Sequence, residues 1–282
     1  MRVDRSLLVL AAVLLGACTA EEASGPKDLA STPFGEQASG GGGGSAPSAA
    51  STTKEPQKAT LAAAGTGEAA LATNVDAATL THPEVVLLLM AGKDGATWIC
   101  TGSLVSSTVV VTAAHCLQSA LFDGWEVVAP TLASRPRVKG TPRMYDEAWA
   151  EVDHPDLGIV KLAEPIVLPR YAQLTDVSGR VDGGTSLSVA GLVRSAELPL
   201  APLKRTPTFP VRSTVSLGYA AGYGVPLYSK GGDSGAGLFL VENGQMTHAL
   251  VGVEREPDPD NGIDHLSRID AKFIGWVAQN GG

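Results

Sequence analysis

Short apolar runs separated by turn residues recur along the chain and limit the folds that it can adopt. Residues 85–90 (VVLLLM) and 109–112 (VVVT) have the length and β-branched content of buried strands. Further short strands are expected at residues 98–100, 103–105, 159–162, 186–189, 211–217, 237–241 and 249–253. One helix is expected near the C-terminus, where Asp270 is placed to cap it. The pattern predicts an all-β sandwich or barrel with a closing helix.

The N-terminus indicates an exported protein. Arg2 and Arg5 precede an apolar run at residues 7–15, as in a secretory signal. The run ends in LGAC, residues 15–18, which resembles the bacterial lipobox, in which the cysteine is lipidated. We interpret residues 1–18 as a lipoprotein signal peptide. A cleaved signal with an incidental cysteine is the alternative.

Lipid on Cys18 would place the protein at a membrane of the bacterial cell envelope. Three acyl chains anchor a protein stably, whereas one chain holds it only weakly. Thr19 rather than Asp follows the cysteine, which by resemblance to Gram-negative lipoproteins favours the outer membrane, facing the periplasm. Residues 19–72 are rich in Ala, Gly, Ser, Thr and Pro, so we expect a disordered linker. The folded domain is then residues 73–282.

Charge and cysteine content narrow the class of protein further. The 282-residue chain has a net charge of -8, which argues against nucleic-acid binding, because that needs clustered Lys and Arg. Of its three cysteines, Cys100 and Cys116 remain if Cys18 carries lipid. An even pair in an exported chain predicts a disulfide. Closing a loop of about 15 residues in this way stabilises the fold by roughly 3 kcal/mol.

Residues 230–237 (KGGDSGAG) set one serine, Ser234, among glycines and directly after an aspartate. A nucleophilic serine needs an exposed oxygen, a partner for its proton, and N–H donors for the oxyanion that forms. Glycines permit a tight turn that leaves its N–H groups uncovered. The stretch therefore offers a nucleophile and an oxyanion hole, although Gly-rich turns with Asp and Ser are also common without catalysis.

Two upstream segments supply candidate partners for this serine. His115 follows a predicted strand within TAAHC, and imidazole titrates near neutral pH, as a general base must. Asp156 opens the segment DLGIVKL, where a buried carboxylate can orient the imidazole and stabilise its cation. Taken singly, a histidine is more often structural, and an aspartate before a strand is more often turn chemistry.

The three segments together resemble the landmark motifs of the chymotrypsin/trypsin family of serine endopeptidases, in that family's order. Four other stretches also resemble family segments, namely residues 100–105, 250–253, 267–269 and 275–277. The resemblance covers about residues 73–280. It implies two antiparallel β-barrels, with His115 and Asp156 from the first and Ser234 from the second meeting in a cleft.

The resemblance also implies a mechanism. His115 takes the Ser234 proton, Ser234 attacks the peptide carbonyl to form an acyl-enzyme, and the N–H groups of Gly232 and Ser234 hold the oxyanion. No metal or organic cofactor is needed. A bridge between Cys100 and Cys116 is common in the family. We expect a monomer that acts on protein or peptide substrates.

The sequence departs from the family pattern in the region of activation and of substrate pairing. Family members expose an N-terminus whose ammonium pairs with the aspartate before the serine, here Asp233, but no Arg or Lys stands immediately before residues 72–76 (ATNVD). Either an unusual cleavage near Thr73 supplies an amine, or another group neutralises the carboxylate. Residues 254–257 (EREP) replace Ser-Trp-Gly, and Pro257 lacks the N–H that would pair with substrate.

A third departure lies in the primary specificity pocket. Its base, six residues before Ser234, is Tyr228, where a trypsin-like enzyme has Asp. Tyr228 either fills the pocket and favours small residues or turns aside. Asp264 lies roughly where the other wall should be and would attract Lys or Arg instead. The disulfide that braces the pocket in the family is missing, since Lys230 stands at its first cysteine position.

Two other function classes compete with a peptidase. One is a non-catalytic member of the fold, a lipoprotein that binds a partner through the former cleft; the departures favour it and the complete triad speaks against it. The other is an esterase, which is disfavoured because Ser234 lacks the Gly-x-Ser-x-Gly elbow of α/β-hydrolases. The sequence therefore predicts a serine endopeptidase.

Overall fold

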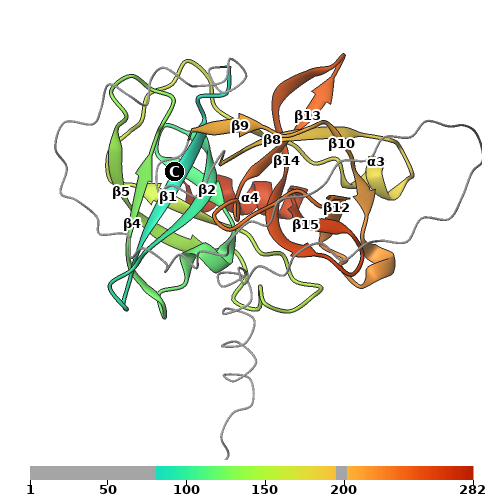
Figure 1. The fold of residues 1–282 in the computed structure, drawn as a ribbon, viewed down its shortest axis with the longest axis horizontal. Coiled ribbons are helices and arrows are strands. Elements are labelled where there is room, and N and C mark those ends of the chain that lie inside the picture. The colour runs from blue at the N-terminus through green and yellow to red at the C-terminus, as the bar shows by residue number, and fades with distance from the viewer. Residues whose placement is uncertain (1–80, 195–201, 282) are drawn as a thin grey trace, which may run out of the picture. The chain divides into compact units, whose positions relative to one another are not determined.

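The structure, a computed structural model, describes residues 81–194 and 202–281 (Figure 1). The predicted signal peptide with Cys18, the predicted linker 19–72 and the first residues of the predicted domain 73–282 lie outside the described residues. Within the described ranges, no helix is long and apolar enough to cross a membrane.

The first half of the described chain forms a closed antiparallel barrel of six strands. The strands are β1 (Val85–Gly92), β2 (Thr97–Ser106), β3 (Val109–Thr112), β4 (Phe122–Val128), β5 (Arg137–Met144) and β6 (Gly158–Leu162). Their order around the barrel is β1-β2-β3-β6-β5-β4 (Figure 1). Strand β1 is buried along nearly its whole length, as its continuous aliphatic run predicts.

The second half forms a nine-stranded sheet. Its strands are β7 (Gln173–Leu174), β8 (Ser188–Arg194), β9 (Leu203–Arg205), β10 (Phe209–Pro210), β11 (Arg212–Ser213), β12 (Gly222–Pro226), β13 (Gly237–Glu242), β14 (Gln245–Asp258) and β15 (Ile263–Arg268). The main path runs β10-β8-β13-β14-β15-β12-β11. The sheet curls enough for β10 and β12, near its two ends, to touch. All pairings in it are antiparallel except that of the short β7 with β14.

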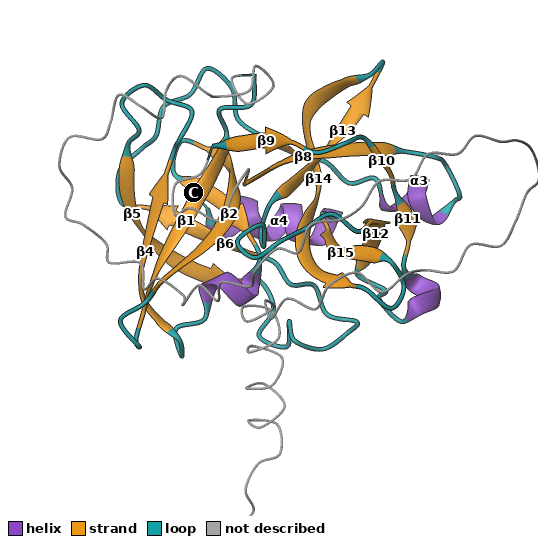
Figure 2. Ribbon diagram, viewed as in Figure 1, coloured by secondary structure: helices purple, strands orange, loops and turns teal. Residues whose placement is uncertain are grey.

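Helical structure is sparse in the described residues and lies mostly outside the sheets (Figure 2). There are two 3-10 turns, η2 (Ala114–Leu117) and η3 (Val215–Leu217), a short helix α3 (Ser178–Asp182) and the closing helix α4 (Ala271–Asn280). Asp270 caps α4 as predicted, since its Oδ1 accepts the N–H of Phe273 at 2.8 Å. The predicted fold class is confirmed as a mostly β structure with a closed six-stranded barrel, a second sheet and a C-terminal helix.

Two predicted strand boundaries were wrong. Residues 98–100 and 103–105 belong to one strand, β2, because Thr101 and Gly102 between them keep pairing with Leu87 and Val86 of β1. Residues 211–217 do not form one strand, because the chain turns into η3, which ends at Gly218 with φ +90°. The sequence pattern also missed β5, whose Gly140 and Pro142 are residue types depleted in strands.

The predicted disulfide between Cys100 and Cys116 is present. It ties β2 to η2 across 16 residues of sequence, and both sulfurs are buried. Loop closure of this length stabilises a fold by roughly 3 kcal/mol. The bridge therefore fixes the 3-10 turn that carries His115 against the neighbouring strand.

Candidate active site

Strand pairing brings the first two candidate residues together. Strand β3 pairs with β6 so that Thr112 faces Gly158, at the point where β3 runs into η2 and just after the loop that carries Asp156. His115 on η2 and Asp156 before β6 therefore lie at the same end of the first barrel. Ala113 beside them is fully buried and small, which leaves room for the imidazole.

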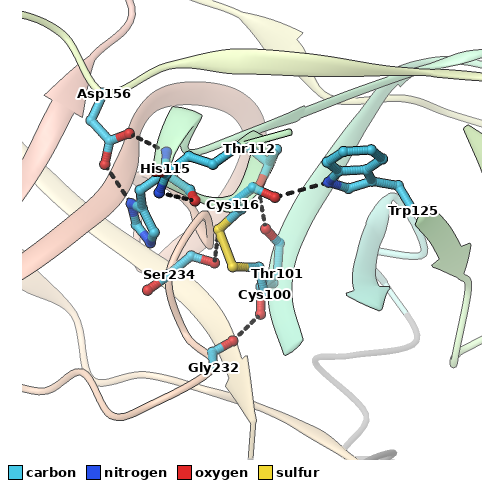
Figure 3. The surroundings of a disulfide bond; sticks show 10 residues. Cys100, Thr101, Thr112, His115, Cys116, Trp125, Asp156, Gly232 and Ser234 are labelled. Carbon is cyan, nitrogen blue, oxygen red and sulfur yellow. Dashed lines mark hydrogen bonds and ion pairs between the residues drawn. A yellow bond between two sulfur atoms is a disulfide. The ribbon is translucent and has the colours of Figure 1, made fainter. Parts of the chain in front are cut away.

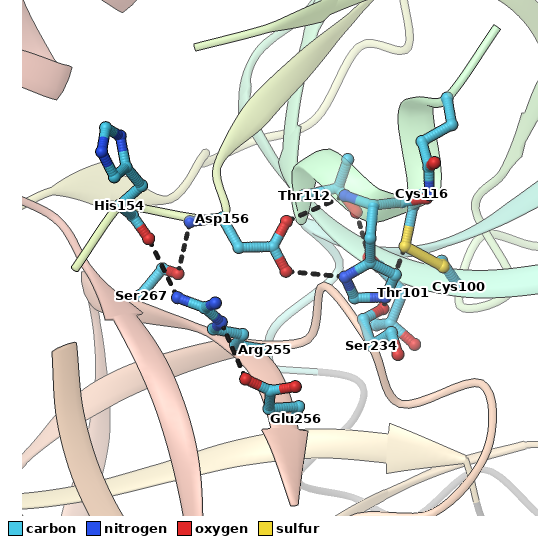
Figure 4. Close-up of polar contacts among 12 residues, drawn as sticks. Cys100, Thr101, Thr112, Cys116, His154, Asp156, Ser234, Arg255, Glu256 and Ser267 are labelled. Carbon is cyan, nitrogen blue, oxygen red and sulfur yellow. Dashed lines mark hydrogen bonds and ion pairs between the residues drawn. A yellow bond between two sulfur atoms is a disulfide. The ribbon is translucent and has the colours of Figure 1, made fainter. Parts of the chain in front are cut away.

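The Asp156 carboxylate holds His115 by two hydrogen bonds (Figure 3). Its Oδ1 accepts the backbone N–H of His115 at 2.8 Å, and its Oδ2 lies 2.6 Å from the ring Nδ1. The carboxylate is buried, with a side-chain exposure of 1%. The N–H of Asp156 in turn donates to Ser267 Oγ of β15 at 2.9 Å (Figure 4). The aspartate is thus fixed from both halves of the fold.

The pKa of His115 lies above its ordinary value of 6.5. Burial is the largest single effect and lowers the pKa. The negative charge of Asp156 and its hydrogen bond to the ring both raise the pKa, and together they outweigh the effect of burial. The charge of Glu256 acts in the same direction and that of Arg255 against it. The ring is therefore a stronger base than a free imidazole, while Nδ1 stays bound to the carboxylate.

Ser234 lies beside the His115 ring, on the side away from Asp156 (Figure 3). Its position is set by β2, because the N–H of Thr101 donates to the Ser234 carbonyl at 2.8 Å and the Thr101 hydroxyl donates to the Gly232 carbonyl at 3.0 Å. Among the described residues no hydrogen bond joins the serine hydroxyl to the ring. Such bonds are often long in unliganded enzymes and tighten with substrate.

Two glycines make this close approach possible. Gly235 has φ +82°, and a Cβ there would lie 2.2 Å from Thr112 Oγ1 and 2.3 Å from the Thr101 carbonyl oxygen. Gly232 has φ +91°. In the resulting turn, the N–H groups of Gly232 and Ser234 make no hydrogen bond to any described residue, as an oxyanion hole requires. The glycine pattern in residues 230–237 therefore has a steric basis.

Comparison with known proteins assigns this arrangement to a family. A sequence model of the family described as trypsin matches residues 74–255. The chain belongs to the trypsin family. A chymotrypsin of Phaedon cochleariae is 31% identical over 107 residues, a match that spans 36% of this chain and 38% of the relative. The chain therefore aligns with well under half of that relative's length.

Solved structures of trypsin-family proteases share the fold. A thermostable serine protease, AL20, from an extremophilic microorganism superimposes with a TM-score of 0.56 at 13% identity, covering 72% of this chain and 98% of its own. HL collagenase gives 0.56 at 16% identity, covering 73% and 96%. The protease Anisep from Arthrobacter nicotinovorans gives 0.54 at 13%, covering 71% and 95%. At these identities the likeness establishes the fold alone.

The residues that the sequence predicts for the primary specificity pocket, Tyr228 and Asp264, form part of a packed polar cluster. The Tyr228 hydroxyl donates to Glu254 Oε2 at 2.9 Å, and its ring stacks on Phe209 with centroids 5.0 Å apart. Asp264 accepts the N–H groups of Tyr228 and Ser229 at 2.6 and 2.9 Å and the Ser229 hydroxyl at 2.6 Å. Asp264 is fully buried. Both of its carboxylate oxygens therefore accept hydrogen bonds from the chain's own donors.

Glu254 is a site residue that sequence patterns do not reveal. It is 1% exposed, and burial raises its pKa well above the ordinary value of 4.5. The nearby charge of Asp264 acts in the same direction, against the hydrogen bond from Tyr228. Burial also raises the pKa of Tyr228 well above 10.0. Burial therefore favours the neutral form of both side chains.

Arg255 and Trp149 are two more residues near the triad that single-sequence reasoning missed. Arg255 donates to the carbonyls of His154 at 2.9 Å and Glu151 at 3.2 Å, and its Nε lies 3.1 Å from Glu256 Oε1 (Figure 4). It therefore pins the loop before Asp156 onto β14. Trp149 on that loop is 7% exposed, with its ring 6.0 Å from that of His115. It packs beside the His115 ring.

A cluster of His82, Glu84 and His248 links the segment before β1 to strand β14. His248 Nδ1 lies 2.6 Å from Glu84 Oε1, and the His248 ring stacks on His82. His82 Nε2 lies 3.1 Å from the Thr247 carbonyl oxygen and Nδ1 lies 2.9 Å from Thr81 Oγ1. Because both ring nitrogens of His82 have protein partners and the two rings stack, the cluster is suited to packing rather than to holding a metal.

Replacing Glu254 with Gln should remove a pH dependence of stability. A carboxyl whose pKa is raised by folding stabilises the native state fully below about pH 4.5, and this contribution is lost as the pH rises through the folded pKa. Relative to wild type, Glu254→Gln should therefore gain thermal stability as the pH rises. The measurement is Tm from pH 4 to pH 9, with the exposed Glu242→Gln as control. Parallel curves for wild type and Glu254→Gln would contradict the argument.

Proposed function

We propose that the chain is a serine endopeptidase with His115 as general base, Asp156 as its orienting carboxylate and Ser234 as nucleophile. The observation that carries the proposal is the His115 ring, bonded to a buried Asp156 through Nδ1 and adjacent to Ser234 on its other side (Figure 3). Membership of the trypsin family supports the same assignment. Protein or peptide chains are the proposed substrates.

In this mechanism His115 Nε2 removes the Ser234 proton as Oγ attacks the scissile carbonyl carbon. Asp156 keeps the Nδ1 proton in place, so that Nε2 is the basic nitrogen, and it stabilises the imidazolium that forms. The N–H groups of Gly232 and Ser234 bind the oxyanion. The imidazolium then protonates the leaving amine, and water, activated by His115 in the same way, releases the acyl group from Ser234.

A fluorophosphonate probe tests this assignment, because it reacts only with an activated serine. Wild type should be labelled, Ser234→Ala should not, and Asp156→Asn should be slowed about 10⁴-fold, as this family's triad implies. The labelling rate should rise with pH as His115 loses its proton. The midpoint of this rise should lie above 6.5, the ordinary pKa of histidine, because Asp156 raises the pKa of His115. Folded wild-type protein that is not labelled would refute the assignment.

The competing function is a non-catalytic binding module. The specific observation in its favour is that Tyr228, at the predicted base of the specificity pocket, is hydrogen-bonded to the buried Glu254. Pro257 adds to this, because it offers no N–H to an incoming peptide. The same probe experiment separates the two functions, since a binding module needs no activated serine.

We further propose that the enzyme cleaves after small residues. The Tyr228 ring is fixed by Phe209 and by Glu254, so it does not turn aside, and large side chains find no room. Attraction of Lys or Arg by Asp264 is disfavoured, because that carboxylate is buried and accepts three hydrogen bonds from Tyr228 and Ser229. Gly and Ala before the scissile bond are the residues that remain.

Peptides that differ only at the residue before the scissile bond test this specificity. Ala should be preferred over Phe, Leu and Lys by at least about tenfold in kcat/KM, the scale of a poorly accommodated side chain. Tyr228→Gly should shift the preference towards larger residues, whereas Tyr228→Phe, which keeps the ring, should not. A wild-type preference for Lys or Arg would instead support the Asp264 alternative.

We also propose a lipid anchor on Cys18 that holds the enzyme in the bacterial cell envelope. The support is the sequence alone: a charged start, an apolar run and LGAC at its end. Cys18→Ser should move the protein from the membrane fraction to the soluble fraction of cells. A variant that stays in the membrane fraction would count against lipidation.

A further inference from the structure

The carboxylate directly before the nucleophile, Asp233, is buried at 2% exposure and bonded on both oxygens. Its Oδ1 accepts the backbone N–H of Arg194, at the end of β8, at 3.0 Å. Its Oδ2 accepts the backbone N–H of Lys230 at 3.1 Å. A buried carboxylate is costly unless hydrogen bonds and opposite charge compensate it. The hydrogen bonds are both supplied by the chain itself.

The Arg194 side chain lies against the same loop. Arg194 is 8% exposed, and its Nη1 donates to the Gly231 carbonyl at 3.2 Å. A Cβ on Gly232 would lie 2.1 Å from Nη1 and 3.1 Å from Cζ. The guanidinium is therefore packed directly on the Gly231–Gly232 segment, whose next N–H groups face the proposed oxyanion. One residue thus contacts both Asp233 and the backbone that must be held in place.

Charge supports the contact geometry. Burial raises the pKa of Asp233 above 3.8, and this is opposed by the two backbone hydrogen bonds and by the positive charges of Arg194 and Lys230. Two other titratable groups interact electrostatically with this carboxylate: Glu254 on β14 and Tyr228 in the segment before the loop. Since Glu254 and Tyr228 bring no positive charge, compensation comes from the two basic residues. Of these, Arg194 also binds the loop through its side chain.

We propose that Arg194 is a positioning residue that holds the oxyanion loop in its competent form, in place of a newly exposed N-terminal ammonium. This inference rests on the proposed endopeptidase function. It follows that the protease needs no cleavage near Thr73 to become active. Arg194 does not touch substrate; it acts through Asp233 and the Gly231–Gly232 peptide.

The two sources of charge have different pH signatures. An α-ammonium loses its proton near pH 8, whereas a guanidinium stays charged above pH 12. A loop held by an N-terminal amine would therefore fail as the pH rises past about 8. A loop held by Arg194 stays in place to about pH 10, and one held by lysine at position 194 fails near the lysine pKa of about 10.4.

The test is fluorophosphonate labelling of the full chain between pH 6 and pH 11. In wild type, the rate should rise as His115 loses its proton and then stay level to about pH 10. Arg194→Met should slow labelling by about 100-fold, the scale of losing one oxyanion donor. Arg194→Lys should restore the rate near pH 8 and decline earlier than wild type. Lys204→Met, which removes an exposed cation from the neighbouring strand β9, should match wild type.

Wild type and Arg194→Lys share Glu254 and Tyr228, so a difference between their alkaline limbs reports on residue 194 alone. The proposal is overturned if the wild-type rate falls with a midpoint near pH 8. It is equally overturned if Arg194→Met, shown to be folded by its thermal transition, is labelled as fast as wild type.

Hydrogen exchange separates this inference from the function on which it rests. In a Ser234→Ala background, the backbone amides of residues 228–236 should exchange faster when Arg194 is replaced with Met. Their exchange rate should not change when Lys204 is replaced with Met. If wild type is not labelled but exchange still depends on Arg194, the positioning role stands and the endopeptidase assignment fails. If exchange is the same in all variants, the positioning role fails.

Discussion

The contact between strand β2 and the loop that carries Ser234 is the interaction on which the rest of the candidate site depends. Thr101 donates its N–H to Ser234 and its hydroxyl to Gly232, and its own carbonyl accepts the Thr112 hydroxyl at 2.8 Å. One residue of the first barrel therefore fixes a loop of the second sheet. The disulfide beside it, from Cys100, holds the turn that carries His115. Neighbouring residues of β2, Cys100 and Thr101, therefore position both His115 and Ser234.

Several carboxylates are buried near the candidate site. Asp156, Asp233 and Asp264 each accept at least two hydrogen bonds from N–H or hydroxyl donors, which is the condition under which a buried charge is stable. Glu254 instead has its carboxyl against the Tyr228 hydroxyl, and its pKa is raised. Glu254 therefore has fewer hydrogen-bond donors than the three aspartates, and its buried Oε1 has none among the described residues.

The sequence predicted the fold class and the three triad candidates because each rests on local signals. Short aliphatic runs predict the strands. The glycines around Ser234 predict a tight turn, and the structure shows that a side chain at Gly235 would clash with its neighbours. Strand β5 escaped because its glycine and proline weaken the local pattern. Arg194 and Glu254 escaped because their roles come from contacts across the sheet, which no spacing in one sequence encodes.

The departures from the family pattern are coupled rather than independent. A tyrosine at the pocket base would bury its hydroxyl without a partner, and Glu254 supplies the acceptor at 2.9 Å. An aspartate at 264 would be a costly buried charge, and the backbone of residues 228–229 supplies its donors. Tyr228 and Glu254 are hydrogen-bonded to each other, so replacing either one alone removes the partner of a buried polar group.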